Sequence, residues 1–303
     1  MTLSFIVLAH TDAASLDRLL QVLSPYPVFL HVDQSAVKRG YFDRSNARGM
    51  SHVTTNLRPR CVHWGGYSIV RAMMETLAVA LDEKSPVSDH IAFLSGQCFP
   101  LRPVEEFAEY IATASNAVHC RAFDLARAKR EALGITRVTR RHWLDGPIGH
   151  LREETPRLAG GLARRLAVLA TAPFPMRPPA IVHASGSQWV VVPRALGKEL
   201  VAHYLRGGFD YLENAYAPDE IAVPSYVYNS DWALLTQSGQ LQEWDGITVA
   251  PYPNYHWLRH DLDGLVDHSD VLAGLASGEY FVRKVSDSTS SDVMELLSTG
   301  LRT

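Results

Sequence analysis

The chain has 303 residues, of which 47% are hydrophobic and 20% are charged, as in a soluble globular protein with a large core. Its formal net charge of −3 argues against a nucleic-acid partner, which usually requires a basic surplus. The three cysteines are far apart and odd in number, so neither a disulfide framework nor a structural zinc site is expected.

Strands and helices alternate from the N-terminus onward. Apolar runs predict strands at 3–9, 27–33, 52–56 and 90–95, and amphipathic patterns predict helices at 15–23, 67–83 and 103–113. This alternation is typical of an α/β fold with a mostly parallel sheet covered on both faces. Ligands bind at the carboxyl ends of such strands, where this chain has Ala9-His10, Asp33 and Ser95-Gly96-Gln97.

The segment 121–180 interrupts this order. It is rich in arginine and has no obvious strand, so we interpret it as an irregular insertion in a single domain of residues 1–303. A leucine stripe runs along 158–169 at helical spacing. Such a stripe usually packs on its own core, but it could touch a membrane surface. The first apolar run is too short for a signal peptide or a membrane span. We therefore expect a cytoplasmic protein with at most peripheral membrane contact.

The C-terminal half returns to regular patterns. They predict a strand at 187–193, a helix at 194–205, a helix with a proline kink at 218–229, a strand at 246–252, and helices at 262–276 and 291–300.

Several common motifs are missing from the sequence. It has no GxGxxG after the first strand, no P-loop, no GxSxG elbow and no HExxH. A cluster within 256–270 does offer His256, His260, Asp261, Asp263 and Asp267. Its acids recur at helical spacing beside leucines, which favours a solvated helix face. A metal-dependent hydrolase that loses activity in EDTA is the alternative interpretation.

Two adjacent carboxylates, Asp219 and Glu220, follow Pro218 and precede an apolar run. Proline at the first position and acids in the first turn are typical of a helix start. One carboxylate could also be a catalytic base. The two interpretations are compatible, because a helix dipole would keep the carboxylate ionised, as a general base must be.

Seven short segments, ordered along the chain, support a family assignment: "FIVLAH", "LHVDQS", "VHWGGYSIVRA", "FLSGQCFPLRP", "SGSQWVVVPR", "YAPDE" and "YFVRK". Together they resemble glycosyltransferase family 14, which contains the core-2/I-branching β-1,6-N-acetylglucosaminyltransferases and the peptide O-xylosyltransferases. The resemblance includes the shorter bacterial relatives and extends from Phe5 to Lys284.

The resemblance implies a GT-A type fold and an inverting glycosyltransferase. The donor would be a UDP-sugar, UDP-GlcNAc or UDP-xylose, and the acceptor a hydroxyl of a glycan or another molecule. No cofactor and no divalent metal would be needed. Most GT-A enzymes hold a metal with an Asp-x-Asp after an early strand, whereas here that position reads "HVDQS".

The resemblance also implies roles for individual residues. Glu220 would be the general base. Val7, Asp33 and Gly65 would bind the nucleoside part of UDP, and Arg259 and Lys284 would compensate the charge of its diphosphate. Gln97, Asp219 and Trp244 would lie at the sugar and acceptor site.

The sequence departs from the family at Cys98, where the family often has an acid. This substitution leaves open a third interpretation, a non-catalytic relative that binds a sugar nucleotide without turnover. Acceptor-binding charges of the family cannot be matched within 121–180. The candidates there rest on composition alone: Arg137, Arg140, Arg141 and Trp143.

Overall fold

The computed structural model describes residues 2–55, 59–114, 117–128, 134–145, 166, 169–170, 174–244, 254–259 and 264–301. The strands are β1 Leu3–Ala9, β2 Val28–Val32, β3 Val53–Thr55, β4 His90–Ser95, β5 Cys98–Pro100, β6 Ala122–Asp124, β7 Ala184–Gly186, β8 Val191–Pro193, β9 His256–Leu258 and β10 Phe281–Arg283. The α-helices are α1 Ala13–Val22, α2 Gln34–Lys38, α3 Ser68–Leu81, α4 Val104–Thr113, α5 Thr136–Thr139, α8 Arg194–Leu205, α9 Ala222–Tyr228, α10 His268–Ala276 and α11 Ser291–Gly300.

The largest sheet has the strand order β3-β2-β1-β4-β8. Its first four strands are parallel, and β8 pairs antiparallel with β4. The central strands β1 and β4 are almost wholly buried. They read as continuous apolar runs because helices or other chain segments cover both of their faces.

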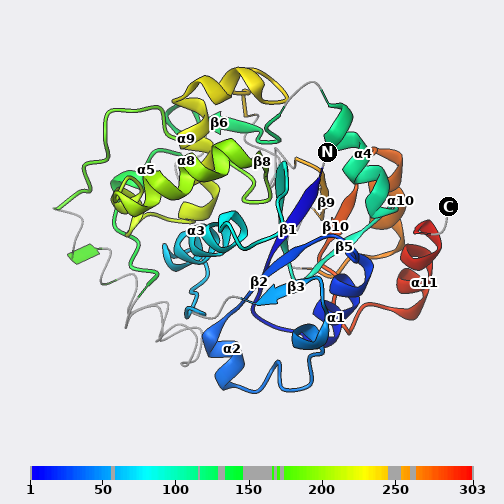
Figure 1. Cartoon of the computed structure of the whole chain (residues 1–303). Helices are drawn as coiled ribbons and strands as arrows, with labels where there is room; N and C mark the ends of the chain where they lie inside the picture. Colours follow the sequence, from blue (N-terminus) through cyan, green and yellow to red (C-terminus); the bar gives the residue numbers. More distant parts are fainter. Residues whose placement is uncertain are drawn as a thin grey trace.

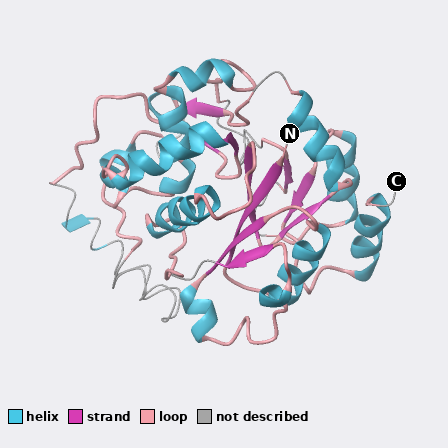
Figure 2. Cartoon of the chain, viewed as in Figure 1, coloured by secondary structure: helices cyan, strands magenta, loops and turns pink. Residues whose placement is uncertain are grey.

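Helices flank this sheet on both sides (Figure 1; Figure 2). On one face α3 packs against β1 and β2, and α8 packs against α3. On the other side lie α1, α4, α10 and α11, with a second, three-stranded sheet of order β5-β10-β9. An aromatic cluster joins the two sheets: Phe107 of α4 contacts Phe5 of β1 and Phe281 of β10, at ring-centroid distances of 6.4 and 5.2 Å.

The predicted α/β class is confirmed: a mostly parallel mixed sheet is flanked by helices, as expected of a GT-A type fold. The strands predicted in 3–95 correspond to β1, β2, β3 and β4, and the helices predicted in 15–113 correspond to α1, α3 and α4. The helices predicted at 194–205 and 291–300 correspond to α8 and α11.

Other predictions need correction. The segment 218–229 is a 3₁₀ turn, η5 Pro218–Glu220, followed by α9, in which Pro224 lies in the first turn and causes no kink. The helix predicted at 262–276 begins only at His268, because Asp267 caps it. The segment 121–180 does contain a strand, β6, which pairs with β7. The strand predicted at 246–252 lies outside the described residues.

The leucine stripe of 158–169 lies mostly outside the described residues, although Leu166 and Leu169 are described and exposed. Within the described ranges, no helix has the length and the apolar character that a bilayer crossing requires.

Candidate active site

The strand order creates a topological switch point at the centre of the large sheet. The chain runs from β1 through β2 to β3 on one side, and then crosses to β4 on the other side of β1. In open α/β sheets, ligands bind outside the carboxyl ends of the strands at such a point. Here those ends are Ala9 of β1 and Ser95 of β4, and Asp33 directly follows the neighbouring β2.

Glu220 ends the turn η5, and its side chain is 43% exposed. Its Oε2 atom forms an ion pair of 2.8 Å with Nη2 of Arg137, whose side chain is only 2% exposed. Its Oε1 atom accepts no hydrogen bond from any residue within the described ranges. One oxygen is therefore anchored and the other is open, which is the geometry that a general base requires.

Asp219, in contrast, is 4% exposed. Burial, reinforced by the negative charge of Glu220, raises the pKa of Asp219 to about 7. Pro218 and the two acids do begin a helical turn, as expected, but it is the three-residue 3₁₀ turn η5, and α9 begins only at Ala222. The expected lowering of a carboxylate pKa by a helix dipole is wrong for Asp219, because burial raises its pKa. The expected sugar contact of Asp219 stays a prediction: its side chain is buried, and its Oδ1 has no hydrogen-bond partner among the described residues.

Gly65 and Asp33 belong to one loop system. The carboxylate of Asp33 is buried and accepts two backbone hydrogen bonds, from Ala36 at 2.8 Å and from Val62 at 2.6 Å. The first bond caps α2, and the second fixes the loop that leads to Gly65. Gly65 in turn accepts a hydrogen bond of 2.9 Å from the backbone nitrogen of Ala217, just before η5. Asp33 thus supports the loop that contacts the Glu220 turn.

Trp244 packs on the short sheet of β6 and β7. It is buried and stacks on Phe123 of β6 at a ring-centroid distance of 5.1 Å. Phe123 pairs directly with Ser185 of β7, and the hydroxyl of Ser185 accepts a hydrogen bond of 2.8 Å from Nη1 of Arg137. Directly opposite residues of an antiparallel pair lie on one face. The aromatic pair and Glu220 are therefore linked through Arg137.

The carboxyl end of β4 carries a buried polar cluster. Gln97 is 7% exposed, and its Oε1 has no hydrogen-bond partner among the described residues. Cys98 is fully buried, within 3.3 Å of Nε2 of His256 and 3.4 Å of Oγ of Ser95. Burial raises the pKa of the Cys98 thiol. The sulfur at the position of the family acid therefore packs within the protein.

The two cations predicted to bind the diphosphate, Arg259 and Lys284, lie at the ends of two paired strands. In the parallel pair β9-β10, Leu258 lies opposite Arg283, so Arg259 and Lys284 follow at adjacent strand ends. Adjacent strands lie only about 5 Å apart. The backbone beside Lys284 is fixed to the switch point, because Val285 donates a hydrogen bond of 2.9 Å to the carbonyl of Gln97.

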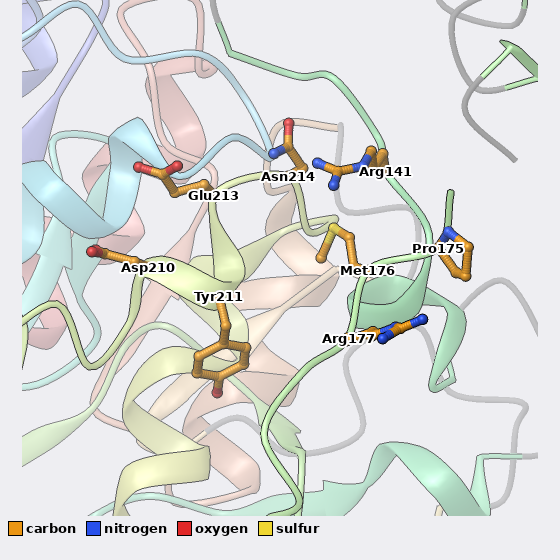
Figure 3. Close-up of a pocket in the computed structure, with 8 residues that line it drawn as sticks. All are labelled: Arg141, Pro175, Met176, Arg177, Asp210, Tyr211, Glu213 and Asn214. Carbon is orange, nitrogen blue, oxygen red and sulfur yellow. The ribbon is translucent and has the colours of Figure 1, made fainter. Parts of the chain in front are cut away.

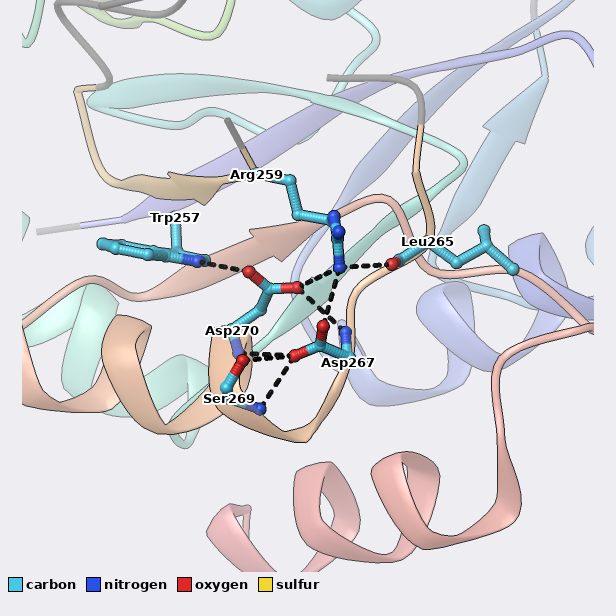
Figure 4. A network of polar contacts seen from close by, with 6 residues as sticks. All are labelled: Trp257, Arg259, Leu265, Asp267, Ser269 and Asp270. Carbon is cyan, nitrogen blue, oxygen red and sulfur yellow. Dashed lines mark hydrogen bonds and ion pairs between the residues drawn. The ribbon is translucent and has the colours of Figure 1, made fainter. Parts of the chain in front are cut away.

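The guanidinium of Arg259 is already engaged with acids. Its Nη1 atom lies 2.9 Å from Asp267 and 2.7 Å from Asp270, at the start of α10 (Figure 4). The same nitrogen donates to the carbonyl oxygen of Leu265 at 3.1 Å. Arg259 therefore also stabilises the capped end of α10.

A family model described as Branch, Core-2/I-Branching enzyme, matches residues 3–261. The chain belongs to the Core-2/I-Branching enzyme family. It is therefore a glycosyltransferase, as the sequence predicted, and Glu220, Gly65 and Arg259 lie within the matched range.

Two solved structures are distantly similar to this chain. Mouse xyloside xylosyltransferase 1, in its apo form, is 10% identical, with 95% of this chain and 99% of that chain covered and a TM-score of 0.37. Mannose-1-phosphate geranyltransferase from Thermus thermophilus is 16% identical, with a TM-score of 0.27. That alignment covers 69% of this chain and 54% of that chain. No curated protein matches the sequence.

The positions of two arginines in this Core-2/I-Branching enzyme were not predicted from the sequence. Arg283 donates a hydrogen bond of 3.2 Å from Nε to Oγ of Ser95 and lies 5.7 Å from the centre of the Trp189 ring. The sequence attributed the charge of this strand end to Lys284 alone. Arg137 appeared only as an acceptor-side candidate by composition, whereas the structure buries it against Glu220.

Val7 does not fit its predicted contact with the base of UDP. It lies in the middle of β1 and is 0% exposed. The strands β2 and β4 cover its two edges, and it belongs to the hydrophobic core. Its position in β1 therefore leaves no surface for a nucleotide to contact.

The histidine and acid cluster of 256–270 does not converge in its described part. His256 is fully buried, and burial together with the charge of Arg283 lowers its pKa to about 3. Asp267 and Asp270 are instead paired with Arg259, and 260–263 lie outside the described residues. In the part of the chain that the structure describes, no three His, Cys, Asp or Glu side chains are grouped to hold a metal ion.

A separate cavity of about 410 Å³ lies between the segments 141–177 and 210–214, lined by Arg141, Pro175, Met176, Arg177, Asp210, Tyr211, Glu213 and Asn214. Figure 3 shows its two arginines on one side and its two carboxylates on the other. None of the residues predicted for UDP or catalysis lines this cavity. It is therefore distinct from the site around Glu220.

Proposed function

We propose that this enzyme transfers a sugar, N-acetylglucosamine or xylose, from its UDP conjugate to an acceptor hydroxyl, with inversion at the anomeric carbon. The observation that supports this most directly is the carboxylate of Glu220. Its Oε2 is fixed by a buried arginine, while the side chain remains 43% exposed. A carboxylate held in this way suits proton abstraction from an incoming hydroxyl.

In the proposed reaction, Oε1 of Glu220 takes the proton of the acceptor hydroxyl. The hydroxyl oxygen then forms a bond to the anomeric carbon, while the bond from that carbon to the phosphate oxygen breaks. UDP leaves with the electron pair of the broken bond. The proton on Glu220 later passes to solvent, so the enzyme returns to its starting state.

The departing diphosphate needs positive charge close to it. Lys284 and Arg259 at the ends of β10 and β9, with Arg283 beside them, can supply that charge without a bound ion. We therefore propose a metal-independent reaction with no cofactor. Asp33 acts indirectly in this proposal, because it holds the loop of Gly65. Val7 is not included as a ligand contact. Asp219 stays a candidate sugar contact, because its Oδ1 has no partner among the described residues.

Trp244 and Gln97 are proposed to face the sugar and the acceptor. Trp244 is linked to Glu220 through Phe123, Ser185 and Arg137. Gln97 contributes a buried carbonyl oxygen, Oε1, that has no partner among the described residues and that a substrate hydroxyl could satisfy.

The test is UDP release from UDP-GlcNAc and from UDP-xylose, with water and a panel of simple glycosides as acceptors. The variant Glu220→Gln keeps the shape of the side chain but cannot accept the proton. We expect it to bind UDP normally and to lose roughly 10²–10⁴-fold in kcat. Glu106→Gln is the matched control, since Glu106 is an exposed carboxylate of α4.

Two results would contradict the proposal. Near wild-type turnover by Glu220→Gln would exclude this residue as the base. Loss of wild-type activity in EDTA, restored by a divalent metal, would exclude the metal-independent reaction. A wild-type protein that binds UDP but turns over neither donor would instead support a non-catalytic relative.

A further inference from the structure

Arg137 is a fully buried cation whose side chain makes four hydrogen bonds within the described ranges. Nε donates to the carbonyl of Tyr216 at 3.1 Å, Nη1 to Oγ of Ser185 at 2.8 Å, and Nη2 to the carbonyl of Ala217 at 2.9 Å and to Oε2 of Glu220 at 2.8 Å. Among the described residues, Glu220 is the one carboxylate within ion-pair distance of it. Such a cation must be paired, because an isolated charge in the interior is strongly disfavoured.

The backbone of Arg137 holds the same turn as its side chain. The carbonyl of Arg137 accepts a hydrogen bond of 2.9 Å from the nitrogen of Tyr216. The next residue, Ala217, has a φ of 47°, in the left-handed region that alanine seldom adopts. A turn of this kind persists when its surroundings determine it. Arg137 therefore fixes both the turn that presents Glu220 and the carboxylate itself.

The burial of Arg137 excludes a direct contact between its side chain and the acceptor. A side chain that is 2% exposed presents no surface to an acceptor. Arg137 belongs to α5, in the segment 121–180, so the acceptor-side insertion provides the residue that holds the candidate base. The candidate base and the insertion are therefore connected through the ion pair of Arg137 with Glu220.

We propose that Arg137 is a positioning residue for catalysis: it fixes Oε2 of Glu220 so that Oε1 meets the acceptor hydroxyl. This inference rests on the proposed role of Glu220 as the base. It predicts that loss of the arginine affects the proton-transfer step far more than donor binding, because the contacts of Arg137 described above are with the Glu220 turn and β7.

The test measures kcat and the donor KM for UDP release, with water as the acceptor and with the donor that the wild type uses. We expect Arg137→Lys to lower kcat about 10- to 100-fold, since small misplacements of a catalytic group have effects of this size. The donor KM should stay within about twofold of wild type. Added guanidinium should restore part of the activity of Arg137→Ala.

Two further variants separate positioning from support of the fold. Asp17→Ala removes the hydrogen bonds that Ser45 and Asn46 donate to a carboxylate of α1, so we expect it to lower stability while its kcat stays close to wild type. Glu220→Asp leaves the arginine intact but withdraws the carboxylate by one methylene. Its kcat should fall although its fold is preserved. This variant keeps the test valid even if the Arg137 variants fold poorly.

The double variant Arg137→Lys/Glu220→Gln provides the decisive comparison. If the arginine acts through the glutamate, the double variant should be as active as Glu220→Gln alone. A further loss of the same size as in Arg137→Lys would overturn the proposal, as would wild-type kcat in Arg137→Lys or in Glu220→Asp. Near wild-type activity of Glu220→Gln would instead refute the proposed function itself, so the two failures are distinguishable.

Discussion

The carbonyl oxygen of Gly65 accepts a hydrogen bond of 2.9 Å from the backbone nitrogen of Ala217. Both residues have a positive φ, 73° at Gly65 and 47° at Ala217. The bond joins the loop after β3 to the turn that presents Glu220. Two motifs that are far apart in the sequence, "HWGG" and "APDE", therefore meet as one structural unit.

The first prediction concerns the substitution Gly65→Ala. A Cβ atom at this position would lie 3.2 Å from Cδ1 of Leu144 and would have to adopt the left-handed φ of 73°. We expect the free energy of unfolding to fall by about 1–2 kcal/mol. We also expect kcat to fall, because the displaced carbonyl no longer fixes Ala217. Chemical denaturation and UDP-release rates measure the two effects.

Gly49→Ala is the matched control for this prediction. A Cβ atom at Gly49 would have no neighbour within 4 Å, and its φ is not in the left-handed region. Its stability should change by no more than about 0.5 kcal/mol. Equal effects of the two substitutions would show that the bond from Gly65 to Ala217 has no special role.

The long elements of this fold could be predicted from the sequence because their patterns extend over enough residues. The apolar run of β1 and the amphipathic repeat of α3 are examples. The second sheet could not be predicted in this way. Its strands β5, β9 and β10 have three residues each, and no periodicity can be measured over so short a segment.

Part of the candidate site could likewise be predicted from the sequence, and part could not. The motifs predicted that Gly65, Glu220, Arg259 and Lys284 matter, and the structure places each at a turn or a strand end. The burial of Asp219 and of Arg137 depends on segments that meet only in the folded chain. The spacing of residues along the chain does not show which distant segments come into contact. Neither the raised pKa of Asp219 nor the ion pair of Arg137 with Glu220 could therefore be predicted from the sequence.

The second prediction concerns Asp33→Ala, which removes two backbone hydrogen bonds of a buried carboxylate. We expect the free energy of unfolding to fall by about 1–3 kcal/mol. UDP affinity, measured by calorimetry, should also fall, because the loop that leads to Gly65 loses its anchor at Val62. Asp43→Ala, at an exposed aspartate whose side chain accepts no hydrogen bond from the described residues, is the control. Lower stability with unchanged UDP affinity would assign Asp33 a purely structural role.

The third prediction concerns Lys284→Ala. If this lysine compensates the diphosphate, its removal should lower kcat by about 10²–10³-fold. The fold should be retained, because Lys284 is half-buried at the end of β10 and its backbone contacts remain. Lys198→Ala, at an exposed lysine of α8, provides the control. Arg259→Ala is less informative, since it also leaves Asp267 and Asp270 unpaired.

The fourth prediction follows from the buried carboxyl of Asp219. Burial raises its pKa from 3.8 to about 7. Below about pH 4 the carboxyl is protonated in both the folded and the unfolded chain. As the pH rises from about 4 to about 7, the unfolded chain releases this proton while the folded chain retains it. The contribution of Asp219 to stability is therefore complete at low pH and is lost as the pH rises through that window.

Asp219→Asn removes the titrating group but keeps the size of the side chain. We expect the free energy of unfolding of this variant, relative to wild type, to increase between about pH 4 and about pH 7, by up to about 1.4 kcal/mol per pH unit. Above about pH 7 the difference should stay constant. Urea denaturation across this range measures the effect, with Asp292→Asn at an exposed position of α11 as the control. A difference that does not change with pH would mean that Asp219 is ionised in the folded protein, and that Arg137 stabilises both carboxylates rather than Glu220 alone.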